Sequence, residues 1–199
     1  MYIYADMDGF LVKYNYSGYI GKNPLYLQKG MHYFRDLEPD EKAITVLKLL
    51  SEQKEHEIKI LTQVSNQGLI YMEHVIDKME WLKKYAPFID VETQFIPVVS
   101  DKQEILSMLL DPNRPLFTLQ HVLIDDWNPN LNGWHNAGGT ALKYCNGLNS
   151  PNAINPKITY PGINLTQNMT AEEIVTLINM LPNKSLEQPL QQNEPESDA

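Results

Sequence analysis

The chain has 199 residues, of which 43% are hydrophobic and 21% charged, and its formal net charge is -9. This length and composition are ordinary for one globular domain with a full hydrophobic core. The negative charge argues against a broad surface for a nucleic-acid polymer, and no apolar stretch approaches the ~20 residues of a membrane span. The single cysteine, Cys145, excludes an internal disulfide and fits a reducing compartment, so we expect a cytoplasmic protein.

Short apolar runs alternate with amphipathic helical patterns along the chain. The apolar runs predict strands, and apolar residues spaced three and four apart predict helices. The expected strands are residues 2–5, 58–61, 95–99, 121–124 and 140–144. The expected helices are residues 40–54, 68–85, 102–110 and 170–181. In the helix over 68–85, the apolar spacing predicts a buried face of Ile70, Val75, Met79 and Leu82, and Thr170 with Glu173 forms a capping box at the start of the last helix.

Strands and helices that alternate in this order favour an α/β fold, a three-layer Rossmann-like parallel sheet with helices on both faces. We expect one domain over residues 1–183. Residues 13–39 follow the first strand, are rich in tyrosine and glycine, and fit the sheet pattern poorly, so we interpret them as a small cap insert. Residues 184–199 are mostly Gln, Pro, Asn, Glu and Ser, which predicts a disordered acidic tail.

Polar side chains follow the first four expected strands, at the point where each strand ends. In an open parallel sheet, ligands bind beyond the carboxyl ends of the strands, so we expect these side chains to converge on one edge. They are Asp6 and Asp8 after the first strand, Thr62 after the second, Lys102 after the third, and Asp125 and Asp126 after the fourth.

The residue types at this edge indicate a hard metal ion and an anionic oxygen ligand. Clustered carboxylates repel one another, and ligands that offer only oxygen select Mg²⁺ above softer metals. A lysine and a hydroxyl suit a phosphate group. Asp6 and Asp8 are two residues apart in an extended segment, so their side chains point the same way. One could attack phosphorus while the other donates and accepts protons.

These residues also resemble a known family. Asp6-Met7-Asp8-Gly9 after an apolar strand, Thr62, Lys102 and Asp125-Asp126 resemble the four motifs of the haloacid dehalogenase-like superfamily. Residues 4–9 and 33–39 are most similar to its 5′(3′)-deoxyribonucleotidase branch. The resemblance covers roughly residues 2–149. It implies a Mg²⁺-dependent phosphomonoesterase, a 5′-nucleotidase that acts on (deoxy)nucleoside monophosphates through an aspartyl-phosphate intermediate.

The resemblance also implies a catalytic and a metal-binding role for four aspartates. Asp6 matches the nucleophile and a metal ligand. Asp8 matches the general acid and base, with its backbone carbonyl on Mg²⁺. Asp126 matches the metal-binding acid of the last motif, and Asp125 supports it or binds the metal through water.

Four further residues match the positions that hold the substrate in this family. Thr62 and Lys102 match the phosphate-holding positions, while Tyr14 and Phe34 fall where aromatic rings contact the nucleobase or sugar. The expected partner is therefore a small phosphorylated substrate, neither a nucleic-acid polymer nor a membrane. Two other interpretations stay open: a phosphatase of the same mechanism for a sugar phosphate or another small metabolite, and a non-catalytic phosphate- or metal-binding protein. Tyr14 and Phe34 could also pack the cap without contacting a ligand.

Overall fold

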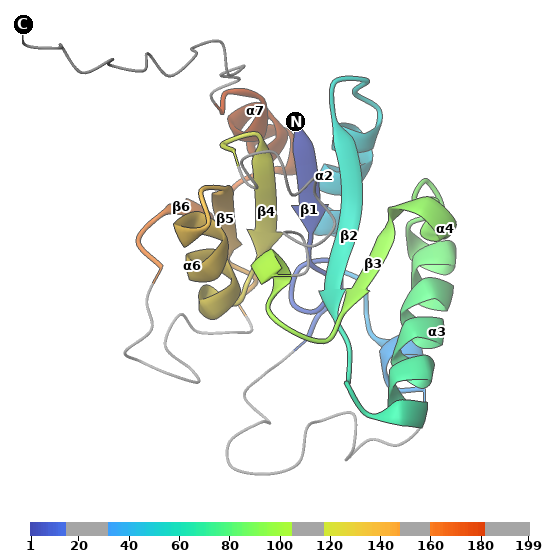
Figure 1. Ribbon diagram of the computed structural model, residues 1–199. Coiled ribbons are helices and arrows are strands. Elements are labelled where there is room, and N and C mark those ends of the chain that lie inside the picture. Colours follow the sequence, from blue (N-terminus) through green and yellow to red (C-terminus); the bar gives the residue numbers. More distant parts are fainter. Residues whose placement is uncertain (15–31, 105–117, 148–159, 182–199) are drawn as a thin grey trace, which may run out of the picture.

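The computed structural model describes residues 1–14, 32–104, 118–147 and 160–181. These residues form a six-stranded sheet in the order β3-β2-β1-β4-β5-β6, in which all neighbouring strands are parallel (Figure 1). The strands are β1 (Tyr2–Ala5), β2 (Glu57–Gln63), β3 (Phe95–Val98), β4 (His121–Asp125), β5 (Thr140–Tyr144) and β6 (Ile163–Leu165). The predicted α/β fold with a parallel sheet is confirmed.

β1 is short, yet it lies in the middle of the sheet. It pairs with β2 on one side and with β4 on the other, and Ala5 is level with both Ile60 and Ile124. Central parallel strands are covered on both faces and are therefore apolar nearly throughout, as β1 and β4 are. β3 contains Pro97, which lacks an N–H group for the ladder, and it accordingly lies at an edge.

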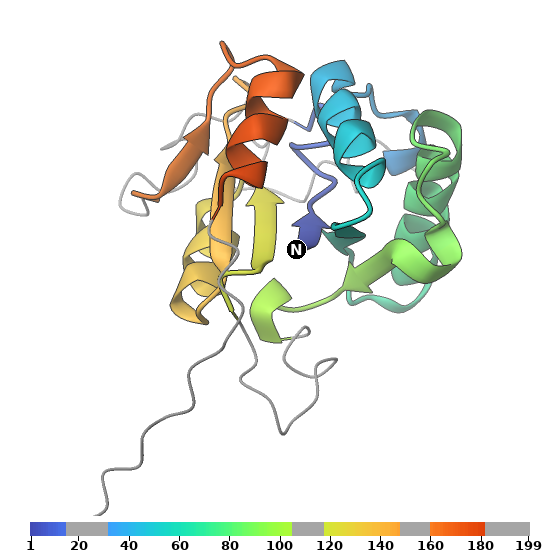
Figure 2. The ribbon, with the colours of Figure 1, turned by 90° about the horizontal axis from the view of Figure 1, so that it is seen from above.

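Helices cover both faces of the sheet (Figure 2). One face carries α2 (Glu41–Ser51), α3 (Gly68–Tyr85) and α7 (Ala171–Asn179), and the other carries α6 (Asn128–Asn136). The larger core combines strand residues with apolar side chains of α2, α3 and α7. Its members include Ile3, Ile60, Ile124, Leu47, Trp81 and Ile178. The smaller core on the opposite face packs Tyr4, Leu61, Leu123 and Ala141 against Leu131 and Trp134 of α6.

Most predicted elements are confirmed within a few residues, and local capping explains several of their ends. α2 starts after Asp40, whose carboxylate accepts a hydrogen bond from the Ala43 N–H at 3.1 Å. The capping box of α7 is present, with Thr170 and Glu173 each bonding the other's backbone N–H. α3 and β5 have the predicted bounds.

The predicted buried face of α3 is confirmed at Leu82 and wrong at its other three residues. Ile70, Val75 and Met79 are only partly buried. The buried residues of this helix are His74, Asp77, Lys78, Trp81 and Leu82. The face of α3 that turns inward meets polar groups at its N-terminal half and the apolar core only near Trp81, so apolar spacing alone assigned the wrong face.

Several short elements were not predicted: the 3-10 turn η2 (Phe34–Asp36), α4 (Val91–Gln94), α6 and β6. α6 has the sequence NPNLNGWHN, with only Leu131 and Trp134 as buried apolar anchors. Residues 102–104 are helical, as predicted, but the rest of that helix, most of the predicted cap and the predicted tail lie outside the described residues. In the part of the chain that is described, no helix is both long and apolar enough to cross a membrane.

Candidate functional site

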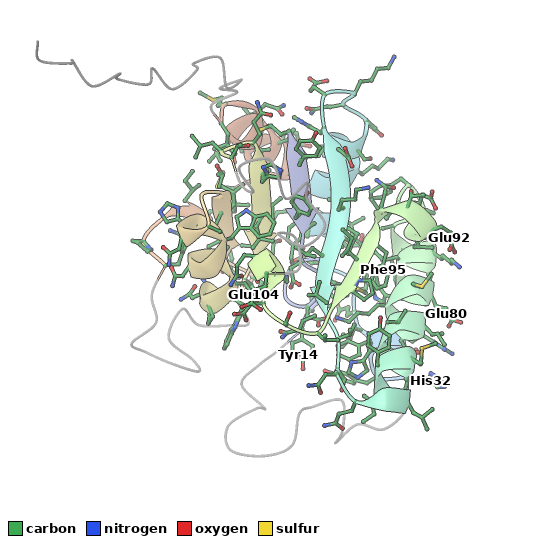
Figure 3. The ribbon with its side chains drawn as sticks, viewed as in Figure 1. Tyr14, His32, Glu80, Glu92, Phe95 and Glu104 are labelled. Atoms are coloured by element: carbon green, nitrogen blue, oxygen red, sulfur yellow. The ribbon has the colours of Figure 1, made fainter. Side chains whose placement is uncertain are left out.

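The predicted site residues lie together at the carboxyl ends of the central strands. The backbone N–H of Asp6, just past β1, donates to the carbonyl of Ile124 in β4 at 2.9 Å, which fixes Asp6 beside the end of β4. Figure 3 labels two residues of this end of the molecule, Tyr14 beyond the strand tips and His32 beside the first turns of α3. The buried polar side chains include Asp6, Thr62, Lys102, Asp125 and Asp126.

Lys102 joins two aspartates at the carboxyl ends of β1 and β4. Its side chain is 1% exposed, and its Nζ donates to Asp6 Oδ1 at 2.5 Å and to Asp125 Oδ2 at 2.7 Å. The sequence prediction placed this lysine near the carboxylates, and the structure brings it into direct contact with two of them. Charge-assisted hydrogen bonds of this length hold both carboxylates in fixed positions.

Burial is the largest single influence on the pKa of Asp6 and on that of Lys102. Loss of hydration raises the pKa of Asp6 to about 7, because Lys102 offsets only part of that cost while Asp125 and Asp8 add repulsion. Burial by itself would lower the pKa of Lys102, but Asp125 and Asp6 outweigh it and raise that pKa above its ordinary value. The lysine therefore stays charged, but its single positive charge cannot balance the three buried carboxylates of Asp6, Asp125 and Asp126.

The remaining contacts of Asp125 come from the start of α6. Asp125 Oδ1 accepts from the backbone N–H of Trp127 at 2.7 Å, and Oδ2 accepts from Asn130 Nδ2 at 2.9 Å in addition to Lys102. Both oxygens of Asp125 are thus hydrogen-bonded to the protein. This favours a role in which Asp125 supports the site through its hydrogen bonds and does not bind a metal directly.

Asp126 is held by a different set of groups. Asn146, which follows β5, donates from Nδ2 to Asp126 Oδ2 at 3.0 Å and to the Gly9 carbonyl at 2.7 Å. Lys143 in β5 donates to the Asp126 carbonyl at 2.9 Å. The sequence prediction missed both Asn146 and Lys143, because β5 carries no carboxylate pair to draw attention to its end.

Asp6, Asp125 and Asp126 form a cluster that can hold a metal ion. All three are buried, and one carboxylate oxygen from each lies within 4.8 Å of the others. Gly9 gives this cluster room: its φ is 93°, and a Cβ there would lie 2.1 Å from Asp126 Oδ2. Three buried carboxylates, of which only Asp6 and Asp125 contact a lysine, fit a hard divalent cation.

A second lysine, Lys78 on α3, contacts two more of the predicted site residues, Asp8 and Thr62. It is fully buried, and its Nζ donates to Asp8 Oδ2 at 2.7 Å, to Thr62 Oγ1 at 2.7 Å and to the Gln63 carbonyl at 2.8 Å. Its Nζ also lies 4.6 Å from the centroid of the Phe34 ring. The sequence prediction missed Lys78, although a polar stripe at helical spacing with His74 was a signal for it.

A cavity of about 440 Å³ adjoins these groups and is lined by Asp6, Asp8 and several aromatic and neutral polar residues. Tyr14 and Phe34 are among the lining residues, and each is 4% exposed. Their rings are nearly parallel, with centroids 6.1 Å apart. The structure therefore brings both predicted aromatic residues to the site, where they pack against each other.

His74 lines the same cavity in its neutral form. Its Nδ1 accepts from the Ser65 N–H at 3.1 Å, and its ring packs edge-on against Phe34 with centroids 4.6 Å apart. Burial, together with the nearby charge of Lys78, lowers the pKa of His74 to about 4 against a smaller opposing effect of Glu73. A neutral ring with Nδ1 as acceptor carries its proton on Nε2.

An ionic cluster fastens the η2 segment to α3. Asp77, with a side chain 1% exposed, contacts Arg35 Nη2 at 3.1 Å and His32 Nδ1 at 2.9 Å. Arg35 Nε also lies 2.7 Å from Glu80 Oε2. His32, Glu73 and Asp77 have metal-ligand spacing, but Arg35 already supplies a cation to Asp77, so we assign this cluster to anchoring.

Comparison with known proteins informs the fold. No protein-family model matches the chain, and a search of curated proteins found no relative. Among solved structures, the chain is similar to a hydrolase from Pseudomonas syringae, with a TM-score of 0.53 and 11% sequence identity over 90% of this chain and 99% of that one. At this identity the likeness shows the fold. The chain thus has a parallel α/β fold with a buried acidic cluster at the carboxyl edge of its sheet.

Proposed function

We propose that this protein is a hydrolase, and more narrowly a Mg²⁺-dependent phosphomonoesterase. The observation that carries the proposal is the buried cluster of Asp6, Asp125 and Asp126 with metal-ligand spacing, in contact with Lys102. The solved structure with a similar fold is described as a hydrolase, which supports the broader class. The contacts of Asp8 and Thr62 with Lys78 add a second cationic environment next to the first.

In the proposed reaction, two aspartates divide the chemistry. An Asp6 carboxylate oxygen attacks phosphorus, the bond from phosphorus to the leaving oxygen breaks, and Asp8 donates a proton to that oxygen. Asp8 then accepts a proton from a water molecule, whose oxygen attacks the phosphoryl group on Asp6. Inorganic phosphate leaves, and both side chains return to their starting states.

The other residues hold the phosphoryl group and the metal. Thr62 and Lys102 would bind phosphoryl oxygens. Asp6 and Asp126 would bind the metal directly, together with the backbone carbonyl of Asp8, while Asp125 supports the site. When bound, Mg²⁺ would supply positive charge to the phosphoryl oxygens as negative charge develops on them.

For the substrate, we propose a nucleoside monophosphate, so that the enzyme is a 5′-nucleotidase. Tyr14 and Phe34 border the cavity of about 440 Å³ beside Asp8 and offer aromatic surface for a base or sugar. The second candidate is a sugar phosphate, because the neutral side chains of Asn66 and Asn130 line the same cavity and suit hydroxyl groups.

The test is phosphate release from a panel of nucleoside monophosphates and sugar phosphates, with and without Mg²⁺. We expect Mg²⁺-dependent turnover that the Asp6→Asn variant loses, because this variant lacks the nucleophile. The matched control is Asp36→Asn, which removes an exposed carboxylate on η2 and should leave turnover unchanged.

The panel also separates the candidates. Turnover confined to sugar phosphates would keep the mechanism and reject the nucleotidase. Full activity of Asp6→Asn would reject the covalent mechanism. Phosphate and Mg²⁺ binding without turnover of any ester would favour a non-catalytic binding protein.

A further inference from the structure

The proposed reaction leaves the second buried lysine, Lys78, without a role. Its side chain is 0% exposed, and it donates three short hydrogen bonds, at 2.7, 2.7 and 2.8 Å. An ammonium group taken out of water is costly unless every N–H finds an acceptor. Here the acceptors are Asp8, Thr62 and the Gln63 carbonyl, and the first two belong to the proposed chemistry.

The contact between Lys78 and Thr62 has only one possible polarity. A lysine ammonium group donates hydrogen bonds and accepts none, so the Thr62 Oγ1 must be the acceptor at 2.7 Å. The hydroxyl hydrogen of Thr62 then points away from Lys78. In the part of the chain that the structure describes, no hydrogen bond donated by this hydroxyl is found.

The other partners of Lys78 hold its ammonium group in a fixed position. Asp8 Oδ2 and the Gln63 carbonyl fix two of its N–H groups, and the Phe34 ring covers the ammonium at 4.6 Å. Asp8 and Gln63 both line the cavity. The third N–H therefore reaches Thr62 from a rigid position next to the space for a ligand.

We propose that Lys78 is a positioning residue that fixes the Thr62 hydroxyl as a hydrogen-bond donor to a phosphoryl oxygen. Without Lys78 the hydroxyl could rotate and offer its lone pairs to an anion, which weakens binding. The inference rests on the proposed function for its substrate class, but its test requires only inorganic phosphate.

The experiment is a double-mutant cycle of Lys78→Met and Thr62→Val, read as the Kd for inorganic phosphate in the presence of Mg²⁺ by isothermal titration calorimetry. We expect Lys78→Met to weaken phosphate binding about tenfold in the wild-type background. In the Thr62→Val background, Lys78→Met should weaken phosphate binding by about threefold or less, because the hydroxyl that Lys78 orients is already gone. Lys83→Met, at an exposed position of the same helix, is the control and should bind phosphate like the wild type.

A structural role alone would lower the unfolding temperature but weaken phosphate binding equally in both backgrounds, and equal losses would overturn the inference. If the Lys78→Met protein does not fold, the cycle is repeated with Lys78→Gln, which keeps a polar partner for Asp8. Coupling between the two residues in a protein that hydrolyses no ester would uphold this inference and reject the proposed enzyme. A wild-type protein that binds no phosphate would overturn both.

Discussion

Burial raises the pKa of Asp6 from 3.8 to about 7, so between these values the folded protein keeps a proton that the unfolded chain has released. The folded state therefore binds more protons than the unfolded state, and Asp6 makes folding less favourable as pH rises through this window. Well above about pH 7, the loss of folding stability caused by Asp6 is complete. A divalent cation can reach the site fully only when this proton leaves.

We predict from this that, in a chelating buffer, stability falls more steeply between pH 4 and 7 in the wild type than in Asp6→Asn. Mg²⁺ should raise the thermal midpoint of the wild type more at pH 8 than at pH 5, because it competes with a proton at the lower pH. Differential scanning calorimetry across this range measures both effects. The same Mg²⁺-induced shift at both values of pH would contradict the prediction.

Gly9 is the residue whose backbone admits Asp126 to the cluster. In Gly9→Ala the added Cβ would lie 2.1 Å from Asp126 Oδ2, and the φ of 93° is strained for alanine. We predict that this variant loses the thermal stabilisation by Mg²⁺ and responds like Asp126→Asn. Thermal shifts measured over a Mg²⁺ titration give the comparison, and a wild-type response in Gly9→Ala would show that Asp126 does not bind the metal.

At the scale of single residues, the sequence predicted the carboxylates and missed the groups that hold them. Asp6 and Asp125 could be found because they come where apolar strands end, which is a local pattern. Lys78 and Asn146 could not be found in this way. They come from a helix and a loop that only tertiary packing brings to the same edge.

At the scale of elements, η2 is attached to α3 by the ion pair between Arg35 and Asp77. Asp77 is buried, and Arg35 is 36% exposed on its side chain. We predict that Arg35→Met destabilises the fold by about 1–2 kcal/mol, because it removes one partner of a largely buried carboxylate. It should also raise the KM for nucleotides more than it lowers kcat, since Phe34 belongs to η2.

Hydrogen exchange of the amides in residues 32–38, with steady-state kinetics, measures this effect. The control is Lys13→Met, which breaks the exposed ion pair of Lys13 with Glu38 at the end of the same segment. Exposed pairs contribute little, so this variant should behave like the wild type. Equal effects of the two substitutions would argue against anchoring by Asp77.

The capping box of α7 is a second feature at this scale. Ile174 and Ile178 of α7 belong to the same core as α2, so fraying of its first turn loosens that layer. We predict that Thr170→Ala lowers the free energy of unfolding by about 1 kcal/mol, and that Thr170→Ser restores most of it. Urea denaturation followed by circular dichroism measures the difference, and an unchanged midpoint in Thr170→Ala would be inconsistent with the cap.

Local patterns predicted elements where the apolar period was regular, and they failed where partners are polar or the element is short. α3 was found with its bounds but with the wrong face, because His74 and Lys78 are buried against polar groups. α6 was missed because its sequence is rich in asparagine and only two apolar side chains hold it to the sheet. β6 has three residues, too few for a period.

At the scale of the whole molecule, the last buried apolar side chain of the described residues is Leu181, at 9% exposed. We predict that a chain ending at residue 183 keeps the thermal midpoint and the Mg²⁺ response of the full chain. A chain ending at residue 168 should lose cooperative unfolding, because it lacks α7 and uncovers the core beside α2. Calorimetry of both truncations is the measurement, and a lowered midpoint for the longer one would assign the last residues a part in the fold.

The position of β1 in the sheet has a consequence during protein synthesis. Residues 2–5 leave the ribosome well before their partners, because one neighbour of β1 ends at residue 63 and the other at residue 125. The strand that presents Asp6 therefore waits, unpaired on one side, until β4 has emerged as far as residue 125. Pairings so distant in sequence form slowly. The nascent chain thus assembles its acidic cluster late, and chaperones have a long interval in which to bind the unpaired apolar strand β1.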